Sequence, residues 1–257
     1  MKILLALQYH SGDEECASSL AKLIASIMPE GKCRVADVMF SAAPDADIGH
    51  EAVGAMATKF DQVHTYRVRS KANGWPKGPN LHAAETMFYV AEHVFNGRWD
   101  YNGVWLMEPD CLPLHRDFIN LIVQEWTEGA RTILGPWIHT EKPHINGNCI
   151  IGTQFGYHHR REIFVASETQ GWDWQNRKFI CQWGRPSRLM FSDYHHGTEG
   201  NPWRGCEFLF APRALPKGHP LKLREQTPVY LHGVKSWQKA HPCVQATLLG
   251  EQPVPTE

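Results

Sequence analysis

Two kinds of apolar segment alternate along the first 110 residues, and this alternation limits the fold more than any other feature. Three short segments have the pattern of buried strands: residues 2–8, 33–40 and 62–69. Three longer segments indicate helices: residues 13–28, 46–57 and 81–95. A further wholly apolar strand is predicted at residues 103–107. Strands that alternate with helices predict an α/β fold, in which helices flank a mostly parallel central sheet.

The second half of the chain has a different character. Beyond about residue 130, Pro, Gly, Trp and His crowd together and helical periodicity fades. We expect loops and short strands laid over the end of the sheet, where they would form an acceptor site. The 257 residues contain no linker, repeat or low-complexity run, so we predict a single domain with a disordered tail at 251–257.

The net charge of −1 hides an asymmetry between the two halves. Residues 1–130 carry 11 Lys and Arg against 17 Asp and Glu, whereas residues 131–257 carry 15 against 10. The second half also holds most of the ten tryptophans. A positive, aromatic-rich half suits an anionic or ring-shaped partner, although an ordinary solvated surface has the same composition.

Several classes of protein are disfavoured by composition and by missing motifs. The seven cysteines are scattered without a CxxC pair, which indicates neither a disulfide framework nor structural zinc and favours a reducing cytoplasm. The sequence contains no run of about 18 apolar residues, so no membrane span is predicted. The sequence contains no P-loop, GxGxxG or GxSxG pattern, and its histidine pairs lack the spacing of a zinc site.

Two carboxylates, Glu108 and Asp110, directly follow the predicted strand 103–107. In α/β sheets, ligands bind outside the carboxyl ends of the strands. Hard oxygens two residues apart can meet one divalent cation, and such a cation offsets the charge that develops on a departing nucleoside diphosphate. Alternatively, the acidic turn simply ends the strand and caps the following helix.

A second apolar segment, residues 229–231, runs into His232, Gly233 and Lys235. An imidazole can complete a manganese sphere that already holds carboxylates. Glycine allows the backbone to approach a phosphate closely, and the lysine supplies a mobile positive charge. A surface turn with a solvated lysine is the alternative.

Together, these segments resemble motifs of glycosyltransferases with the GT-A fold. Residues 108–110 (EPD) resemble the DxD-type metal motif, and residues 232–235 (HGVK) resemble the carboxy-terminal metal-and-diphosphate motif. Residues 143–152 (PHINGNCIIG) and 75–80 (WPKGPN) are similar to the hxNGN and WPxGxN motifs of small glycosyltransferases from viruses, bacteria and plants. The chain departs from the DxD pattern at Glu108 and Pro109, so Asp110 could be the principal ligand, with Glu108 contacting ribose or water.

The resemblance implies a Rossmann-like sheet, a nucleotide-binding half at 1–115 and a metal and acceptor half at 116–250. It implies Mn²⁺ or Mg²⁺ and a nucleotide-sugar donor, most simply a UDP-sugar. The implied metal ligands are Glu108, Asp110 and His232. The residues implied to lie near the donor or acceptor are His10, Lys77, Asn80, Glu108, Asn146, Asn148, Gly233 and Lys235. Asn-Gly is also the usual signal of a hairpin turn, so Asn146 and Asn148 could be structural.

An inverting transferase also needs a carboxylate base beside the acceptor hydroxyl. The candidates are Asp173 and Asp193, which have aromatic neighbours that could stack on a sugar or a base, and Glu207 as a third. Each could instead cap a turn. A retaining enzyme would need no such base, so the sequence leaves the stereochemistry open.

The acceptor is not fixed by these motifs. Small glycosyltransferases that resemble this chain include bacteriophage enzymes that modify hydroxymethylated pyrimidines in DNA, and the basic residues within 157–188 would suit a strand with a flipped base. A phage-encoded enzyme would act in the host cytoplasm. The near-neutral pI argues against DNA and leaves a glycan or lipopolysaccharide as the alternative acceptor. A non-catalytic nucleotide- or sugar-binding module and a metal-dependent hydrolase are the alternatives to a transferase.

Overall fold

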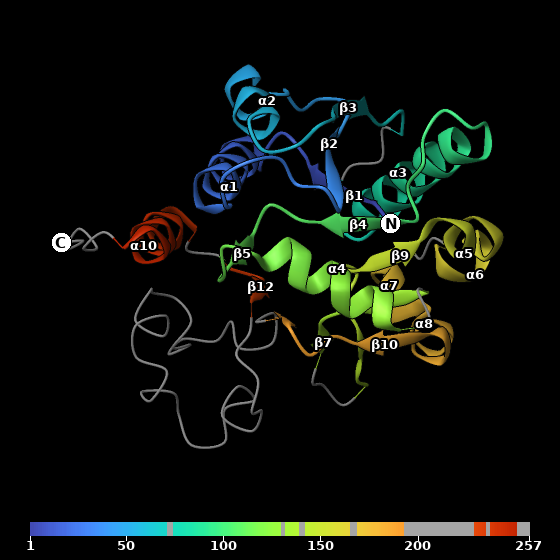
Figure 1. Cartoon of the computed structure of the whole chain (residues 1–257). Coiled ribbons are helices and arrows are strands. Elements are labelled where there is room, and N and C mark those ends of the chain that lie inside the picture. Colours follow the sequence, from blue (N-terminus) through green and yellow to red (C-terminus); the bar gives the residue numbers. More distant parts are fainter. Residues whose placement is uncertain are drawn as a thin grey trace.

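The structure is a computed structural model, and it describes residues 1–70, 74–129, 132–138, 142–164, 169–192, 229–234 and 237–250. Its centre is a seven-stranded sheet with the order β10-β6-β9-β4-β1-β2-β3 (Figure 1). In chain order, the strands are β1 (Ile3–Tyr9), β2 (Ala36–Ala42), β3 (Val63–Arg67), β4 (Gly103–Met107), β6 (Ile133–Gly135), β9 (Ile150–Gly152) and β10 (Gly184–Pro186). β1 pairs in parallel with β2 and β4, and only β9 runs against its neighbours β4 and β6.

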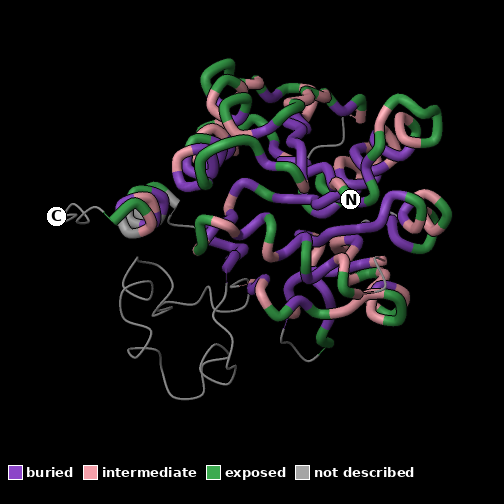
Figure 2. Tube along the Cα trace, in the orientation of Figure 1, coloured by how far each residue is buried: buried purple, intermediate pink, exposed green. Residues whose placement is uncertain are grey.

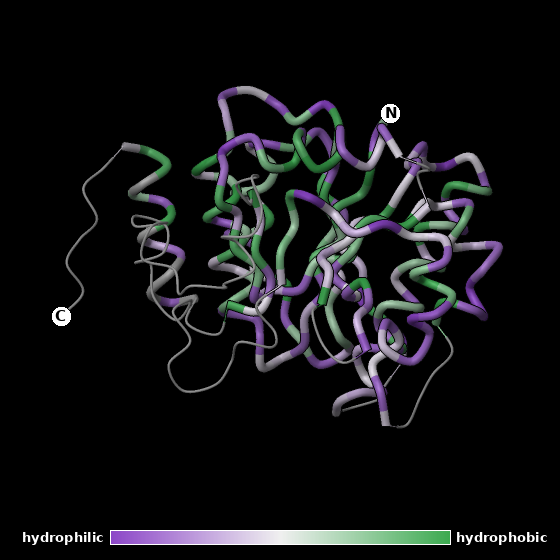
Figure 3. The backbone as a smooth tube through the Cα atoms, turned by 90° about the horizontal axis from the view of Figure 1, so that it is seen from below, coloured by the Kyte–Doolittle hydropathy of each residue, from purple (hydrophilic) through white to green (hydrophobic). Residues whose placement is uncertain are grey.

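Alternate side chains of β1 enter two hydrophobic cores, one on each face of the sheet. Ile3, Leu5 and Leu7 pack with α1 (Glu14–Ile27), α2 (His50–Ala57) and α4 (Phe118–Glu128). Leu4 and Ala6 pack on the opposite face, which is covered by α3 (Lys77–Phe95), α5 (Thr153–His158) and α8 (Arg177–Trp183). The strands β1, β2, β4 and β9 are therefore buried on both faces (Figure 2), whereas the edge strands β3 and β10 are partly exposed. Figure 3 shows hydrophobic stretches running through the interior of the fold. The predicted α/β fold with a mostly parallel sheet is confirmed.

A smaller sheet joins the end of the chain to the centre of the fold. Its strands, in the order β11-β12-β5, are β11 (Met190–Ser192), β12 (Tyr230–His232) and β5 (Cys111–Pro113). β12 runs antiparallel to β5 and places His232 opposite Cys111. Helix α10 (Trp237–Leu249) packs against α1, and Val244 joins Leu23 and Leu231 in a third core cluster. The remaining elements are the hairpin β7 (Trp137–Ile138) and β8 (His144–Ile145) and the helices α6 (Arg160–Ile163) and α7 (Trp172–Gln175).

The second half holds more helix than the sequence predicts. Helices α5 to α8 are four to seven residues long, which is too short to display a helical period in the sequence. Pro242 inside α10 conceals that helix, because proline is expected to break one. Helix α3 begins at Lys77 and not at 81, since Pro79 lies in its first turn, where proline is tolerated. The tail 251–257 lies outside the described residues.

No helix among the described residues is long and apolar enough to cross a bilayer.

Candidate metal centre and cleft

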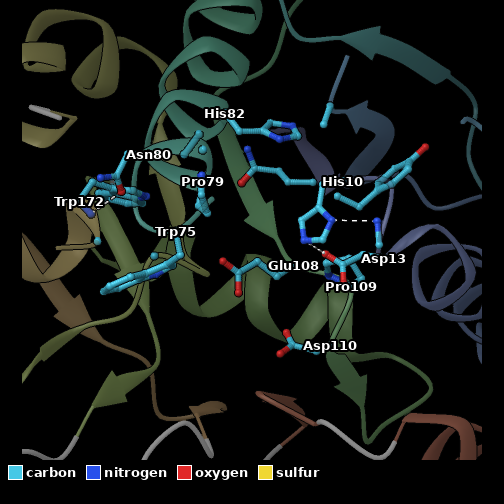
Figure 4. A pocket seen from close by; sticks show the side chains of 18 of the residues that line it. His10, Asp13, Trp75, Pro79, Asn80, His82, Glu108, Pro109, Asp110 and Trp172 are labelled. Carbon is cyan, nitrogen blue, oxygen red and sulfur yellow. Dashed lines mark hydrogen bonds and ion pairs between the residues drawn. The ribbon is translucent and has the colours of Figure 1, made fainter. Parts of the chain in front are cut away.

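A cleft of about 1320 Å³ opens at the carboxyl ends of the parallel strands (Figure 4). The segments after β1, β2, β3 and β4 all reach it, with His10, Asp45, Ser70 and Glu108 among the lining residues. This is the edge of an α/β sheet at which ligands bind. The cleft is larger than the usual pocket for one small ligand, which occupies about 300–1,000 Å³, so it has room for more than one small molecule.

Three potential metal ligands meet in this cleft. Glu108 and Asp110 come from the turn between β4 and β5, and His232 comes from the end of β12. The Nε2 atom of His232 lies 2.8 Å from Glu108 Oε2 and 3.3 Å from Asp110 Oδ1. One ligand atom from each of the three residues lies within 4.8 Å of the other two. The structure thus brings together the three side chains to which the sequence analysis assigns a metal, although Glu108 and His232 lie 124 positions apart.

Backbone hydrogen bonds fix the two segments against each other. Gly233 adopts φ +92°, a left-handed conformation that glycine reaches without strain. This turn allows the N–H groups of Gly233 and Val234 to donate to the carbonyl oxygen of Asp110 at 3.1 and 2.8 Å. The Nδ1 atom of His232 lies 3.2 Å from the Ser192 hydroxyl, which sets the orientation of the ring. Nε2 is thus left facing the carboxylates.

The charge of His232 shows how well the site suits a cation. Burial alone would lower the pKa of His232, but the Asp110 and Glu108 carboxylates raise it to about 10. An imidazolium proton therefore lies between two carboxylates, at a position that a divalent metal ion could take. One nitrogen and two carboxylate ligands suit Mn²⁺ better than Mg²⁺, which prefers oxygen. The residues present fit the implied metal.

The Asn148 side chain is buried against the turn that carries Glu108 and Asp110. It does not line the cleft, contrary to the prediction. Its side chain is 1% exposed and lies among residues of the turn and β12. In the orientation that satisfies both ends of the amide, Nδ2 donates to Tyr230 Oη (2.7 Å) and Leu106 O (3.1 Å), and Oδ1 accepts from Glu108 N (3.1 Å). The Tyr230 hydroxyl donates to the Cys111 sulfur. Three buried side chains thus connect the strands that carry the candidate ligands.

Asp173 is a carboxylate that is held by hydrogen bonds to the hxNGN-like segment. Its Oδ2 accepts from the N–H of Gly147 at 2.8 Å and from Asn146 Nδ2 at 3.4 Å, and Oδ1 accepts from Trp174 N at 2.8 Å. Burial raises the pKa of Asp173, the nearby His144 and these N–H donors oppose the rise, and Glu108 adds to it. Both Asn146 and Asp173 line the cleft, so a rigid carboxylate of increased basicity faces the same space as the metal centre.

The other residues predicted near the donor lie in different settings. His10 lines the cleft and pairs with Asp13 at 2.9 Å. Asn80 also lines it, but its amide joins α3 to the segment before α7 through Trp172 N and Gln170 O. Lys77 is exposed and is not among the lining residues, because it occupies the outward side of the first turn of α3. Lys235, Asp193 and Glu207 lie outside the described residues.

The sequence analysis did not predict a series of hydrogen-bonded polar side chains beside the cleft. His82 Nε2 lies 3.0 Å from the Ser41 hydroxyl, which contacts Thr86 at 2.7 Å, and Gln8 Nε2 donates to Thr86 at 3.1 Å. His82 and Thr86 are four residues apart on α3, a spacing that places both on one helix face. The four-residue spacing of His82 and Thr86, directly after the WPxGxN-like motif, is the sequence pattern from which these contacts could have been predicted. His144, which lies 4.0 Å from Asp173, was missed as well.

The cleft is strongly acidic. Its lining contains six carboxylates: Asp13, Glu15, Asp45, Glu108, Asp110 and Asp173. Among the described lining residues, Lys142 is the only lysine or arginine. A nucleoside diphosphate would be repelled by such a surface unless a cation accompanied it.

No family model matches the sequence, and no curated protein is similar to it. Solved structures are similar in fold. The glycosyltransferase GlyE of Streptococcus pneumoniae TIGR4 aligns at a TM-score of 0.55 and 8% identity, over 100% of this chain and 66% of GlyE. The galactosyltransferase LgtC, solved with donor and acceptor sugar analogs, aligns at 0.51 and 11%, over 98% of each chain. The bifunctional glycosyltransferase WbbM aligns at 0.53 and 8%, over 90% of this chain and 45% of WbbM.

These likenesses confirm the predicted glycosyltransferase fold of the GT-A type. The chain spans just under two thirds of GlyE and less than half of WbbM, but nearly all of LgtC. Identities this low establish the fold alone, so the activity rests on the residues of the cleft.

Proposed function

We propose that the chain is a metal-dependent glycosyltransferase that takes its sugar from a nucleoside-diphosphate donor, with a UDP-sugar as the first choice. The observation that carries this proposal is the convergence of Glu108, Asp110 and His232 at the carboxyl end of β4. The glycosyltransferase fold and the acidic cleft support it, since a diphosphate can enter such a cleft only with a cation.

In this proposal, Asp110 and His232 hold Mn²⁺ or Mg²⁺, and Glu108 completes the site or orients a bound water. Bound metal supplies a positive charge that offsets the charge developing on the diphosphate as the sugar departs. Ser192 keeps the His232 ring in the orientation that presents Nε2. His10 and Asp13, at the exit of β1, would lie along the nucleoside, and Lys235 and Gly233 beside the diphosphate.

For an inverting reaction, Asp173 is our candidate for the base that accepts the proton of the acceptor hydroxyl. Its raised pKa and its fixed hydrogen bonds favour this role over that of a mobile surface carboxylate. Asp193 remains the second candidate from the sequence. The acceptor is either a glycan or a hydroxymethylated pyrimidine in DNA.

The test is thermal unfolding of the purified chain with a panel of nucleotides and nucleotide sugars, in the presence of Mn²⁺ or of a chelator. We expect one nucleotide to raise the melting temperature only with metal. Binding at about 100 times the dissociation constant stabilises a folded protein by roughly 2.7 kcal/mol. Asp110→Ala and His232→Ala should remove the shift.

Asp100→Ala is the matched control, because Asp100 is exposed and lies outside the cleft lining. It should keep the full shift. A chain that binds no nucleotide under any metal condition would contradict the proposal, and release of free sugar without an acceptor would identify a hydrolase instead. Binding that persists with no turnover of any acceptor would favour a non-catalytic nucleotide-binding module.

A further inference from the structure

One corner of the acidic cleft is cationic. Lys142 Nζ lies 5.1 Å from the centroid of the Trp174 ring, and Arg177 Cζ lies 4.3 Å from the same centroid. Lys142 and Trp174 both line the cleft, and Arg177 begins α8 beside them. Two cations that share one indole ring present positive charge and an aromatic surface at the same place.

Trp75 adds a second aromatic ring to this part of the cleft. It is 66% exposed, the most exposed of the large hydrophobic side chains described, and it lines the cleft (Figure 4). The Asn80 amide ties the start of α3 to α7 through Gln170 and Trp172, so Trp75 and Trp174 belong to connected elements. A tryptophan exposed to this extent in a cleft is suited to stacking on a ring of a ligand.

Further positive charge lies on α8 and on α6, which packs against α8. Lys178 on α8 and Arg160 and Arg161 on α6 have no carboxylate within ion-pairing distance among the described residues. Glu162 is the one carboxylate in the described part of these two helices.

Two other arginines of the basic second half serve a different purpose. Arg188 pairs with Glu125 at 3.3 Å, and Arg185 donates to the carbonyl oxygen of Glu125. Their charge is used to attach β10 and the segment after it to α4, so they do not extend the cationic corner.

We propose that Lys142, Arg177, Trp75 and Trp174 form the acceptor subsite, and that the acceptor carries a negatively charged group, a phosphate in the simplest case, beside a ring. This inference rests on the proposed function. The donor diphosphate requires the metal centre at Glu108, which leaves the cationic corner for the other substrate. A neutral acceptor could stack on the two rings but would leave Lys142 and Arg177 without an ion-pair partner, since no described carboxylate lies within ion-pairing distance of either.

The test measures binding to the full chain, without metal, by fluorescence anisotropy at low ionic strength. The labelled probes are a neutral maltooligosaccharide, the same oligosaccharide with a 6-phosphate, and a short oligothymidylate. We expect at least one anionic probe to bind roughly tenfold more tightly than the neutral one, since the cations act at short range. Whichever anionic probe binds more tightly names the source of the phosphate, a glycan or a nucleic acid.

Substituted chains separate this subsite from general attraction between charges. Lys142→Ala/Arg177→Ala should abolish the preference for the anionic probe, and Trp75→Ala should weaken every probe that binds. The control Arg34→Ala/Arg98→Ala removes the same two charges from exposed positions outside the cleft and should keep the preference.

The inference is overturned by equal binding of neutral and anionic probes, or by equal losses in the two double variants. The thermal shift with nucleotide and Mn²⁺ is measured on the unsubstituted chain and does not involve these probes. A failure of the acceptor inference therefore leaves the proposed activity standing. A missing thermal shift would count against the activity and, with it, against the assignment of this subsite to an acceptor.

Discussion

His232 is both deeply buried and positively charged, and this combination depends on two carboxylates. With 2% of its surface exposed, the ring would lose its proton if Asp110 and Glu108 were absent. The proton and a metal ion are alternatives at Nε2, since a histidine must be neutral to coordinate. The side chains of this centre are thus arranged around a positive charge.

At Asp173, the exchange of one oxygen for nitrogen removes the basic carboxylate while the size and shape of the side chain stay nearly the same. We expect Asp173→Asn to lower kcat by about 10²-fold or more, because an amide cannot accept the acceptor proton. KM for the donor should change little, since the metal centre is untouched. Steady-state transfer assays with the acceptor measure both constants.

Retention of the nucleotide-dependent thermal shift would show that the Asp173→Asn chain is folded. Nearly full activity in this variant would exclude Asp173 as the base and direct attention to Asp193→Asn.

At the level of residues, the sequence predicts side chains best where they follow a strand. Glu108 and Asp110 follow β4 at the carboxyl edge of the central sheet, where ligands bind. His232 ends β12 of the smaller sheet, whose antiparallel pairing with β5 brings it to the same turn. The environment of Asn148 could not be predicted in the same way. An Asn-Gly-Asn segment has the same sequence whether its amide faces a sugar or is buried against Tyr230, a residue 82 positions away.

Among the elements, β12 carries the candidate metal ligand His232, and Tyr230 ties this strand to the turn after β4. We expect Tyr230→Phe to destabilise the fold by about 1–2 kcal/mol, because the buried Asn148 amide loses its hydroxyl partner. We also expect weaker Mn²⁺ binding, since the Asn148 amide also holds the Glu108 backbone. Thermal unfolding measures the first effect, and isothermal titration with Mn²⁺ alone measures the second.

Trp105→Phe is the matched control, since it alters a fully buried aromatic side chain that packs against Tyr230 but does not bond the turn. It should cost stability without a comparable loss of metal affinity. If both variants lost the same affinity for Mn²⁺, the Tyr230 hydroxyl would have no role in the metal centre, and Tyr230 would act only through packing.

The elements of the first half could be predicted because each is long enough to display its period. β1, α1, β2 and β4 appear within a few residues of their predicted positions. The elements of the second half could not be predicted, since strands of two or three residues and helices of four to seven residues are determined by tertiary contacts. Ile163 and Ile180, for example, are buried in the core on the α3 face of the sheet.

For the molecule as a whole, two buried histidines with lowered pKa, His82 and His241, contribute to the response to acid. Burial lowers the pKa of both His241 and His82 from the ordinary value of 6.5 to about 4. Between pH 4 and pH 6.5, the unfolded chain therefore binds protons at these two histidines that the folded chain does not bind. The stability that they contribute is complete at neutral pH and falls as the pH drops below about 6.5. His241 alone should cost about 2 kcal/mol near pH 5.

Thermal unfolding between neutral pH and about pH 5 checks this sign. His241→Gln should be less stable than the unsubstituted chain at neutral pH, because the contact with Ser19 is altered. The gap should narrow as the pH falls, since glutamine does not titrate. A gap that stays constant with pH would contradict the expected contribution of His241.

The candidate metal centre joins distant parts of the polypeptide, since Glu108 and His232 lie 124 positions apart. On the proposed function, a bound ion would act as a clasp that closes this long loop and holds β12 in place. Closing a loop of this length restricts the unfolded chain in the way that a disulfide does. Metal starvation would then appear as a shorter lifetime of the protein in the presence of proteases, and not only as slower sugar transfer.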